Sequence, residues 1–325
     1  MTPLKKIAVA LGDPNGIGPE IAVKAAAHFA GSPLRPILVG DAYIIEDQAR
    51  RYAPDLPLTP LDREDASTNG LVFVDTNALA KADFKPGTIT AEAGRATVAY
   101  VTRAVQLAQS GAVDAVIGCP HSETAIHEAG IPFSGYPQLI AELTNTPKDK
   151  AFLMLVAAGL HIAHVTLHES VSSALHRLST ALVVDAALAA VQAEEALGNA
   201  CPRLGIFGIN PHAGENGLFG DDDARITEPA VRQLRERGII VDGPIGADLL
   251  LSRGKHDVYL AMFHDQGHIP IKLLSPLRSS ALTLGTGIVF SSVGHGSAFD
   301  IAGKGVADPA SVIETLGLLN HSERN

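Results

Sequence analysis

The sequence predicts an α/β protein of two domains, with largely parallel sheets covered by helices on both faces. Apolar runs of strand length alternate with stretches of helical spacing over most of the chain, which is the pattern of parallel sheets with helical crossovers. At 325 residues, the chain also exceeds the size that one hydrophobic core usually serves. No internal repeat or low-complexity linker marks a domain boundary.

The expected strands share short apolar runs that end at polar or small residues. They cover residues 7–11, 36–40, 71–75, 114–118, 152–157, 161–168, 203–209 and 257–263. The expected helices share apolar residues at three- and four-residue spacing, and Gly111 and Gly198 stand where two of them end. They cover residues 20–29, 44–51, 91–110, 183–197 and 227–237. Residues 264–272 follow the last strand, and two interpretations stay open: a tight turn at Gly267 with a short run before Pro270, or a loop that opens into a functional crevice.

Charge and cysteine content exclude several classes of protein. The formal net charge of -10 argues against nucleic acid or an anionic membrane as a partner, because both reward basic patches. Cys119 and Cys201 are too few for a disulfide framework and lack Cys-x-x-Cys spacing, so a reducing compartment is expected. The N-terminal apolar run is too short for a signal peptide, and Asp13 and Pro14 interrupt it. We therefore expect a soluble, cytoplasmic protein.

Three predicted strands run directly into a histidine. These histidines are His168, His212 and His264. The carboxyl ends of parallel strands meet at one edge of a sheet, so three neutral imidazoles there are able to hold one divalent transition metal. The alternative is three unrelated loop histidines. His161 and His164 lie inside a strand. They are expected either to pack in the core or to contact the ligand histidines without binding the metal themselves.

Two Gly-rich stretches stand near the two ends of the chain. Residues 12–20 lack both the phosphate-loop spacing and the Gly-x-Gly-x-x-Gly dinucleotide fingerprint, so they fit either a structural turn or the edge of a ligand site. Residues 294–305 are longer. Their small residues let backbone approach a ligand, while His295, Asp300 and Lys304 offer contacts to a ribose, base or phosphate.

These motifs together resemble a known superfamily. Gly16-Ile-Gly18-Pro19-Glu20 with the stretch 294–305 resembles the isocitrate and isopropylmalate dehydrogenases. Residues 208–215 and 263–267 resemble, within it, the 4-hydroxythreonine-4-phosphate dehydrogenase family, over nearly the whole chain. The resemblance implies two α/β/α domains with a cleft between them and no Rossmann fingerprint. One domain is expected from residues 1–128 plus 273–325, and the other from residues 129–272.

The same resemblance implies cofactors and a partner. It implies a homodimer with an active site shared between subunits, and an anionic small molecule as substrate. A divalent metal is expected on His168, His212 and His264, with the third of these coming from the partner subunit. Zinc is favoured, with cobalt, nickel, manganese and magnesium as alternatives. NAD, or alternatively NADP, is expected at Gly294, His295, Gly296, Ser297, Asp300 and Gly303.

The substrate segments depart from the family pattern. Residues 135–137 read Gly-Tyr-Pro where the phosphothreonine enzymes carry Gly-His-Thr, and Ala281 and Phe290 replace an Asn and an Arg. Loss of the Arg removes a bidentate partner for phosphate. With residues 119–127, 165–171 and 266–274, the pattern resembles a branch that oxidises and decarboxylates a cyclic cis-dihydrodiol dicarboxylate, derived from terephthalate, to protocatechuate. Tyr136, Pro137 and Phe290 suit its apolar ring.

Roles follow from this resemblance. We expect Lys272 to steady a carboxylate or enolate, and Asp265 to orient a ligand or accept a proton; the alternative for both is a surface ion pair. The candidate substrate contacts are His121, Ser122, Ser134, Tyr136, Lys272, Arg278 and Phe290. Loop capping is the alternative for the serines, and a solvated charge is the alternative for Arg278. His268 matches no ligand position of the family and is expected to act behind the ligands.

Three other functions stay open at this stage. The first is a 4-hydroxythreonine-4-phosphate dehydrogenase or a related phospho-sugar-acid dehydrogenase with altered anion contacts. The second is a metal-dependent hydrolase, which three histidines alone would permit and which predicts no NAD binding. The third is a catalytically silent binding protein.

Overall fold

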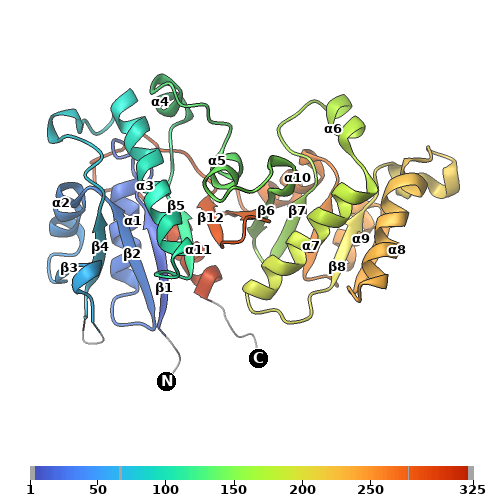
Figure 1. Cartoon of the computed structure of the whole chain (residues 1–325), viewed down its shortest axis with the longest axis horizontal. Helices are drawn as coiled ribbons and strands as arrows, with labels where there is room; N and C mark the ends of the chain where they lie inside the picture. Colours follow the sequence, from blue (N-terminus) through green and yellow to red (C-terminus); the bar gives the residue numbers. More distant parts are fainter. Residues whose placement is uncertain (1–3, 66–67, 277, 321–325) are drawn as a thin grey trace. The chain divides into compact units, whose positions relative to one another are not determined.

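The chain folds into two compact units (Figure 1). A computed structural model describes residues 4–65, 68–276 and 278–320. Unit 1 contains the described residues up to 145 together with 288–320, and unit 2 contains residues 146–287. Both crossing points lie beyond the expected boundaries at 128 and 272. Packing explains the shift, because α5 (Tyr136–Leu143) contacts α3 (Ala91–Gln109) in unit 1, whereas β11 (Ser280–Leu284) pairs with a strand of unit 2.

Unit 1 is built on a parallel sheet. Its strands, in spatial order, are β3 (Leu58–Pro60), β4 (Leu71–Asp75), β2 (Leu34–Gly40), β1 (Lys5–Ala10), β5 (Ala115–Gly118) and β12 (Phe290–Val293). Every neighbouring pair in this order is parallel. Because the strands are covered on both faces, the central ones are continuous apolar runs; residues 7–10 of β1 are fully buried.

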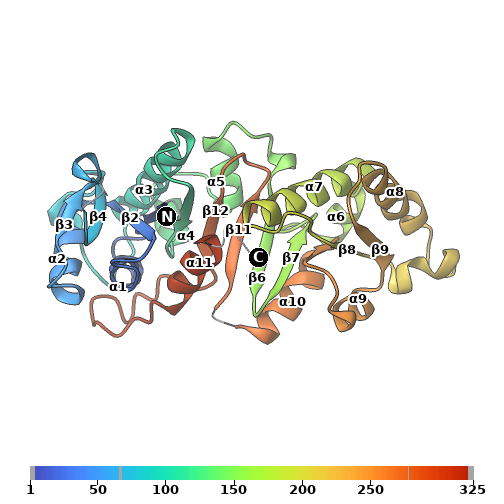
Figure 2. The ribbon, with the colours of Figure 1, turned by 90° about the horizontal axis from the view of Figure 1, so that it is seen from below.

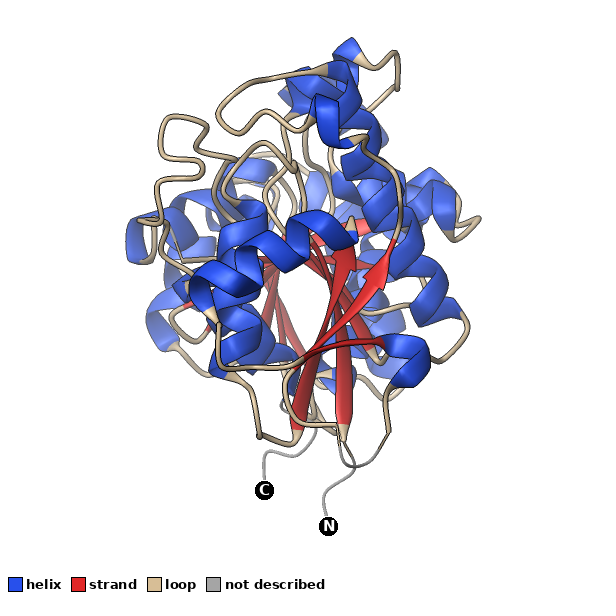
Figure 3. Cartoon of the chain, turned by 90° about the vertical axis from the view of Figure 1, so that its left-hand side faces the viewer, coloured by secondary structure: helices blue, strands red, loops and turns tan. Residues whose placement is uncertain are grey.

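Helices cover both faces of this sheet, as Figure 3 shows in blue against the red strands. α1 and α11 lie on one side of it, and α3 and α5 on the other (Figure 2). The helices of unit 1 are α1 (Gly18–His28), α2 (Ala42–Tyr52), α3, α4 (Glu123–Glu128), α5 and α11 (Ala310–Asn320), with 3₁₀ turns η1 (Leu61–Arg63) and η2 (Lys81–Asp83). The side chain of Thr90 caps α3 by accepting the amide proton of Ala93.

Unit 2 has a mixed sheet. Its strands, in spatial order, are β11, β6 (Phe152–Ala157), β7 (Leu160–His164), β10 (Val258–Ala261), β8 (Leu204–Phe207) and β9 (Val241–Ile245). β11, β6 and β7 are antiparallel neighbours, and β7, β10, β8 and β9 run parallel. Ala158 and Gly159 both have positive φ between β6 and β7, which is the geometry of a tight hairpin turn and confirms the two strands predicted around Gly159.

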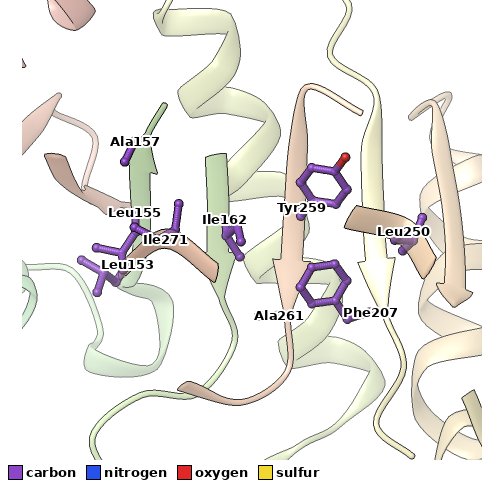
Figure 4. Packing of buried hydrophobic residues seen from close by; sticks show 9 residues of the cluster. All are labelled: Leu153, Leu155, Ala157, Ile162, Phe207, Leu250, Tyr259, Ala261 and Ile271. Atoms are coloured by element: carbon purple, nitrogen blue, oxygen red, sulfur yellow. The ribbon is translucent and has the colours of Figure 1, made fainter. Parts of the chain in front are cut away.

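The helices of unit 2 also lie on both sides of its strands (Figure 2). They are α6 (Val171–Arg177), α7 (Thr180–Ala196), α8 (Glu228–Glu236), α9 (Ala247–Arg253) and α10 (His264–Leu274), with short helical turns η3 (Lys148–Lys150), η4 (Pro211–Gly217) and η5 (Asp223–Thr227). Figure 4 shows how Ile271 of α10 joins the buried side chains of β6 and β7, while Phe207 and Tyr259 fill the space beside Leu250 of α9. This core fixes α10 against the ends of the central strands.

The α/β class with helices on both faces is confirmed in each unit. The main difference between the predicted and the observed secondary structure is at α10. Residues 264–272, expected as a turn with a short run or as a loop, are helical although Gly267 and Pro270 lie inside the helix. The strand expected over 161–168 ends at His164. No single helix of the described residues is long and apolar enough to cross a membrane. Only α6 and α7, which meet at a bend of 94°, pass such a test together, by length and composition.

Candidate active site

His168 and His264 lie side by side at the carboxyl edge of the unit 2 sheet. Both follow neighbouring parallel strands, β7 and β10. The amide of Val165 donates to the carbonyl of Ala261 (2.9 Å), and the hydroxyl of Thr166 donates to the carbonyl of Met262 (2.7 Å). The two strand exits therefore run together, and they bring the imidazole centres of His168 and His264 to 5.5 Å.

Gln266 holds His264 at the first position of α10. Its side-chain oxygen accepts the amide protons of Met262 (2.9 Å) and Phe263 (3.1 Å), and its amide nitrogen donates to the carbonyl of Gly208 (2.9 Å) at the end of β8. These bonds satisfy donors that precede the first helical turn. Gln266 thus joins the ends of β10 and β8 and sets where His264 leaves the sheet.

The His168–His264 geometry fits a shared divalent metal. A zinc–nitrogen bond of about 2.1 Å places the metal about 3.2 Å from each ring centre, so two ligand rings have centres at most about 6.4 Å apart. The observed 5.5 Å lies within this limit. Nδ1 of His264 lies 2.8 Å from Oδ1 of Asp265, an arrangement in which Nδ1 donates to the carboxylate and Nε2 is left as the ligand atom.

His212 stands apart from these two histidines in the single chain. Its Nδ1 is 3.1 Å from Oε2 of Glu215, its ring lies against Phe219, and its side chain is 69% exposed. Across the described part of the chain, no group of three or more His, Cys, Asp or Glu side chains is placed to hold a metal. The resemblance implied that His168 and His212 act together and that His264 comes from the partner; within one chain, the neighbours are His168 and His264.

The loop that carries His212 has an uncommon backbone. Residues 212–216 all have positive φ, between 44° and 82°. Only Gly214 among them lacks the steric penalty of this left-handed region. Asp223 holds the start of the loop, since its carboxylate accepts the amide protons of Ile209 (2.8 Å) and Asn210 (2.9 Å). Strained backbone of this kind is concentrated at functional sites.

Two further histidines complete what we call the histidine cluster, which consists of His164, His168, His264 and His268. His164 is fully buried at the end of β7, and burial lowers its pKa to about 3. The ring of His268 lies 4.7 Å from that of His164 and 3.6 Å from that of His264. Burial also lowers the pKa of His268, to about 4. The sequence predicted that His164 packs in the core or supports the ligands, and that His268 supports them; the structure places the ring of His268 between those of His164 and His264.

Lys272, Asp265 and Arg278 also belong to unit 2. Lys272 donates to the hydroxyl of the buried Ser279 (3.0 Å), and partial burial lowers the pKa of its ammonium group. Asp265 is 80% exposed apart from its contact with His264. Arg278 is exposed, and its carbonyl accepts the hydroxyl proton of Ser275 (2.8 Å). Lys272 is thus the more shielded of the two predicted catalytic groups.

Unit 1 gathers what we call the aromatic cluster, formed by His121, Phe133, Tyr136 and Phe290. The rings meet mostly edge to face, with the centre of Tyr136 at 4.4 Å from His121 and 5.1 Å from Phe290. Gly118 makes the packing possible, because a Cβ there would lie within 3.0 Å of both Tyr136 and Phe290. Three of the predicted substrate contacts are therefore brought together, and Phe133 joins them unpredicted.

The hydroxyl of Tyr136 is turned inward, and His121 is partly buried. Tyr136 is buried and donates its hydroxyl proton to the carbonyl of Cys119 (2.9 Å). Burial lowers the pKa of His121 to about 4. Phe290 is fully buried. The cluster therefore offers an apolar wall rather than charge, and Tyr136 and Phe290 shape it from behind more than from its surface.

The remaining predicted contacts of unit 1 have structural partners. Ser122 accepts the amide proton of Ala125 (3.1 Å) and caps α4. This is the capping role given above as the alternative to substrate contact. Ser134 is hydrogen-bonded to the side chain of Gln138. Asp13, which sequence reasoning did not select, is fully buried at the exit of β1 with one carboxylate oxygen lacking any hydrogen-bond partner. Burial raises its pKa to about 6.

The two Gly-rich stretches pack on each other in unit 1. The amide of Ile17 donates to the carbonyl of Ser297 (2.9 Å), and a Cβ at Gly16 would lie 2.8 Å from Ser297. The carboxylate of Glu20 accepts the amide protons of Gly305 (3.2 Å) and Ala307 (2.8 Å). Residues 12–20 thus support the second stretch, the structural role left open by the sequence.

The predicted NAD residues lie along this supported loop. Nε2 of His295 is 2.6 Å from the hydroxyl of Ser311 in α11. Ser297 is buried with its hydroxyl unpartnered, Asp300 is exposed, and Gly303 has a φ of 75°. An unsatisfied buried hydroxyl and an exposed carboxylate on a glycine-bearing loop are groups that a ribose or amide can engage.

Comparison with known proteins gives consistent relatives. Residues 33–319 match the family described as Pyridoxal phosphate biosynthetic protein PdxA. A 1,2-dihydroxy-3,5-cyclohexadiene-1,4-dicarboxylate dehydrogenase from Comamonas sp is 50% identical over 315 residues, covering 97% of each chain. A solved terephthalate 1,2-cis-dihydrodiol dehydrogenase from Burkholderia xenovorans LB400 is 49% identical, with a TM-score of 0.79 over 98% of each chain. A 4-hydroxythreonine-4-phosphate dehydrogenase from Klebsiella pneumoniae is 34% identical, with a TM-score of 0.86 over 99% of each chain.

Proposed function

The chain belongs to the PdxA family, and we propose that it is a metal-dependent, NAD-linked dehydrogenase that oxidises and decarboxylates a cyclic cis-dihydrodiol dicarboxylate. The products are protocatechuate, CO2 and NADH. The observation that carries this proposal is the 50% identity, over 97% of both chains, to a relative named for that substrate.

The aromatic cluster supports this substrate over a phosphorylated one. Tyr136 and Phe290 are buried, and the only ring nitrogens there belong to His121, whose pKa is lowered by burial. A phosphate group needs charged or multiple donors, which this wall does not offer. The apolar edge of the diol's six-membered carbon ring fits against such a surface with little desolvation of polar atoms.

A divalent metal on His168, His212 and His264 is part of the proposal. When bound, such an ion acidifies a coordinated hydroxyl and polarises a neighbouring carbonyl. His264 presents Nε2 because its Nδ1–H donates a hydrogen bond to the carboxylate of Asp265. All three ligand side chains are at least partly open to solvent, which leaves room for a second copy of the chain to complete the set in a cytoplasmic homodimer.

The chain's own residues then have defined tasks. Lys272, whose pKa is lowered by partial burial, donates to a carboxylate of the substrate and steadies the charge that develops as CO2 leaves. The loop 294–303, supported by Glu20, holds the nicotinamide cofactor. Hydride passes to NAD from the secondary carbinol carbon, which is adjacent to the ring carbon that bears the carboxylate; the product is a β-keto acid, and aromatisation of the ring drives loss of CO2.

A substrate comparison tests the proposal. The enzyme loaded with Zn²⁺ or Co²⁺ and NAD is mixed with the cyclic diol dicarboxylate or with 4-phosphohydroxythreonine, while the absorbance of NADH is followed. We expect NADH with the diol and little with the phosphate. Robust turnover of the phosphate with none of the diol would contradict the substrate assignment.

A separate titration distinguishes a dehydrogenase from a metal-dependent hydrolase. Calorimetry with NAD is expected to give saturable binding to the metal-loaded protein. Ser297→Ala is the test variant, because it removes the unpartnered hydroxyl and adds no volume at this buried position. Absence of any heat of binding with NAD and with NADP would contradict the dehydrogenase class.

A further inference from the structure

Two histidines of the histidine cluster have no task in the proposed reaction. His164 is 0% exposed and ends β7, and His268 lies one helical turn after His264 in α10. Residues four apart on a helix share a face, so His268 covers the same side of α10 as His264. The three rings of His164, His268 and His264 form a continuous series, with successive centres at 4.7 Å and 3.6 Å.

Hydrogen bonding fixes the direction of this series. Nδ1 of His164 is 3.2 Å from the carbonyl of Leu153, which only accepts, so that nitrogen carries the proton. In the neutral ring, Nε2 of His164 is then an acceptor, and Nδ1 of His268 at 3.1 Å must donate to it. The same Nδ1 of His268 also lies 3.2 Å from the carbonyl of His264. One proton on His268 thus serves two acceptors and sets the plane of its ring.

The plane of His268 in turn supports His264. The two rings are stacked, with an interplanar angle of 13°. Asp265 holds the edge of His264 through Nδ1 at 2.8 Å. A carboxylate at the edge still allows the ring to tilt about its own hydrogen bond, and the stacked ring on its face opposes that tilt.

The backbone is shaped for this contact. A Cβ at position 267 would lie 2.3 Å from Nε2 of His164 and 2.8 Å from Ile162. Only glycine therefore lets α10 come close enough for His268 to reach the buried ring. Its presence inside a helix costs about 1 kcal/mol relative to alanine, which the close approach offsets.

We propose that His268 is a positioning residue for the metal ligand His264, and that His164 sets the orientation of His268. This inference rests on the proposed function, because it assigns His264 to the metal. An aliphatic residue at position 268 would fill the same space, but it would have neither a flat face to stack on His264 nor a donor to meet His164.

Metal affinity is the direct test, measured by competition with a chelator for Co²⁺ and by the visible spectrum of bound Co²⁺. His268→Ala is expected to weaken Co²⁺ binding by about 10- to 100-fold, the range for residues that orient ligands. His268→Phe restores a flat ring and is expected to return affinity to within a few-fold of the wild type, with an unchanged spectrum. His164→Leu is expected to weaken binding in the same direction by less. His28→Ala, on the exposed end of α1, is the matched control.

The outcomes separate the two claims. Wild-type affinity in His268→Ala, with unfolding midpoints showing a folded protein, overturns the positioning role alone. A His268→Phe variant as weak as His268→Ala, with a Co²⁺ spectrum that has changed, makes His268 a ligand and also overturns it. Failure of the wild type to bind Co²⁺ or Zn²⁺ overturns the proposed function itself.

Discussion

The aromatic cluster of unit 1 and the histidine cluster of unit 2 are both made of flat rings, yet they are organised in opposite ways. In the aromatic cluster, rings meet edge to face, and the hydroxyl of Tyr136 donates a hydrogen bond to the backbone carbonyl of Cys119. In the histidine cluster, His268 lies parallel to His264, and Nδ1 of His268 bonds to Nε2 of His164. Edge-to-face packing gives the aromatic cluster its shape, whereas in the histidine cluster Nδ1 of His264 meets Asp265 and leaves Nε2 of His264 available for chemistry.

The largest expected effect is on turnover, in a variant that removes one ring of the histidine cluster. His264→Ala is expected to lower turnover by about a hundredfold to a thousandfold, the scale of losing a group that stabilises developing charge, and to lower retention of metal through dialysis. The unfolding midpoint is expected to change little, because the side chain is 35% exposed. Full activity of the variant would refute the ligand assignment.

The aromatic cluster is expected to respond in stability. Phe290→Ala removes a fully buried ring and is expected to lower the free energy of unfolding by about 3–5 kcal/mol, measured by urea denaturation. Tyr136→Phe is the mild control, since it loses only the bond to Cys119, worth about 1 kcal/mol. Equal losses in the two variants would show that ring volume does not dominate this region.

His121 gives the aromatic cluster a pH dependence of defined sign. Its folded pKa of about 4 lies below the ordinary 6.5, so the unfolded chain takes up the proton first as pH falls. The contribution to stability is complete above pH 6.5 and is lost towards pH 4, by up to about 3 kcal/mol. The difference in unfolding free energy between wild type and His121→Gln is expected to follow this window.

Asp13 acts in the opposite direction over an overlapping range, which is why the difference between two proteins is the quantity to measure. Its pKa is raised from 3.8 to about 6, so its contribution is present below pH 3.8 and is lost as pH rises through 6. A difference between wild type and His121→Gln that is flat from pH 4 to 6.5 would contradict the burial of His121.

The smallest expected effect sharpens the role of the backbone at α10. Gly267→Ala places a methyl group 2.3 Å from Nε2 of His164, and overpacking of this kind costs about 1–3 kcal/mol. The variant is also expected to weaken Co²⁺ binding, because α10 must move away from β7. Gly317→Ala in α11, where a Cβ meets nothing within 4 Å and φ is not positive either, is the control that adds the same methyl group to a helix without overpacking. Unchanged metal affinity in Gly267→Ala would show that the approach of α10 to β7 is not required.

Much of the site was predictable because it follows strand order. The exits of β7, β10 and β8 are adjacent and parallel, which predicts histidines near one edge of the sheet; His168 and His264 do meet there, whereas His212 lies on a loop apart from them. The helix α10 was not predictable, because Gly267 and Pro270 are breakers in isolation. The capping by Gln266 and the contact with His164 override them. The His164–His268 contact joins residues 104 positions apart, so no local sequence pattern predicts it.

The left-handed run at residues 212–216 carries a consequence for how this protein tolerates sequence change. His212, Glu215 and Asn216 are exposed, and exposed positions ordinarily accept almost any residue. Here the backbone conformation limits which residues are tolerated, since Gly and Asn enter the left-handed region readily and branched residues such as Val or Ile do not. In a saturation library, this surface segment would therefore tolerate as few substitutions as a core strand, because of its left-handed backbone conformation alone.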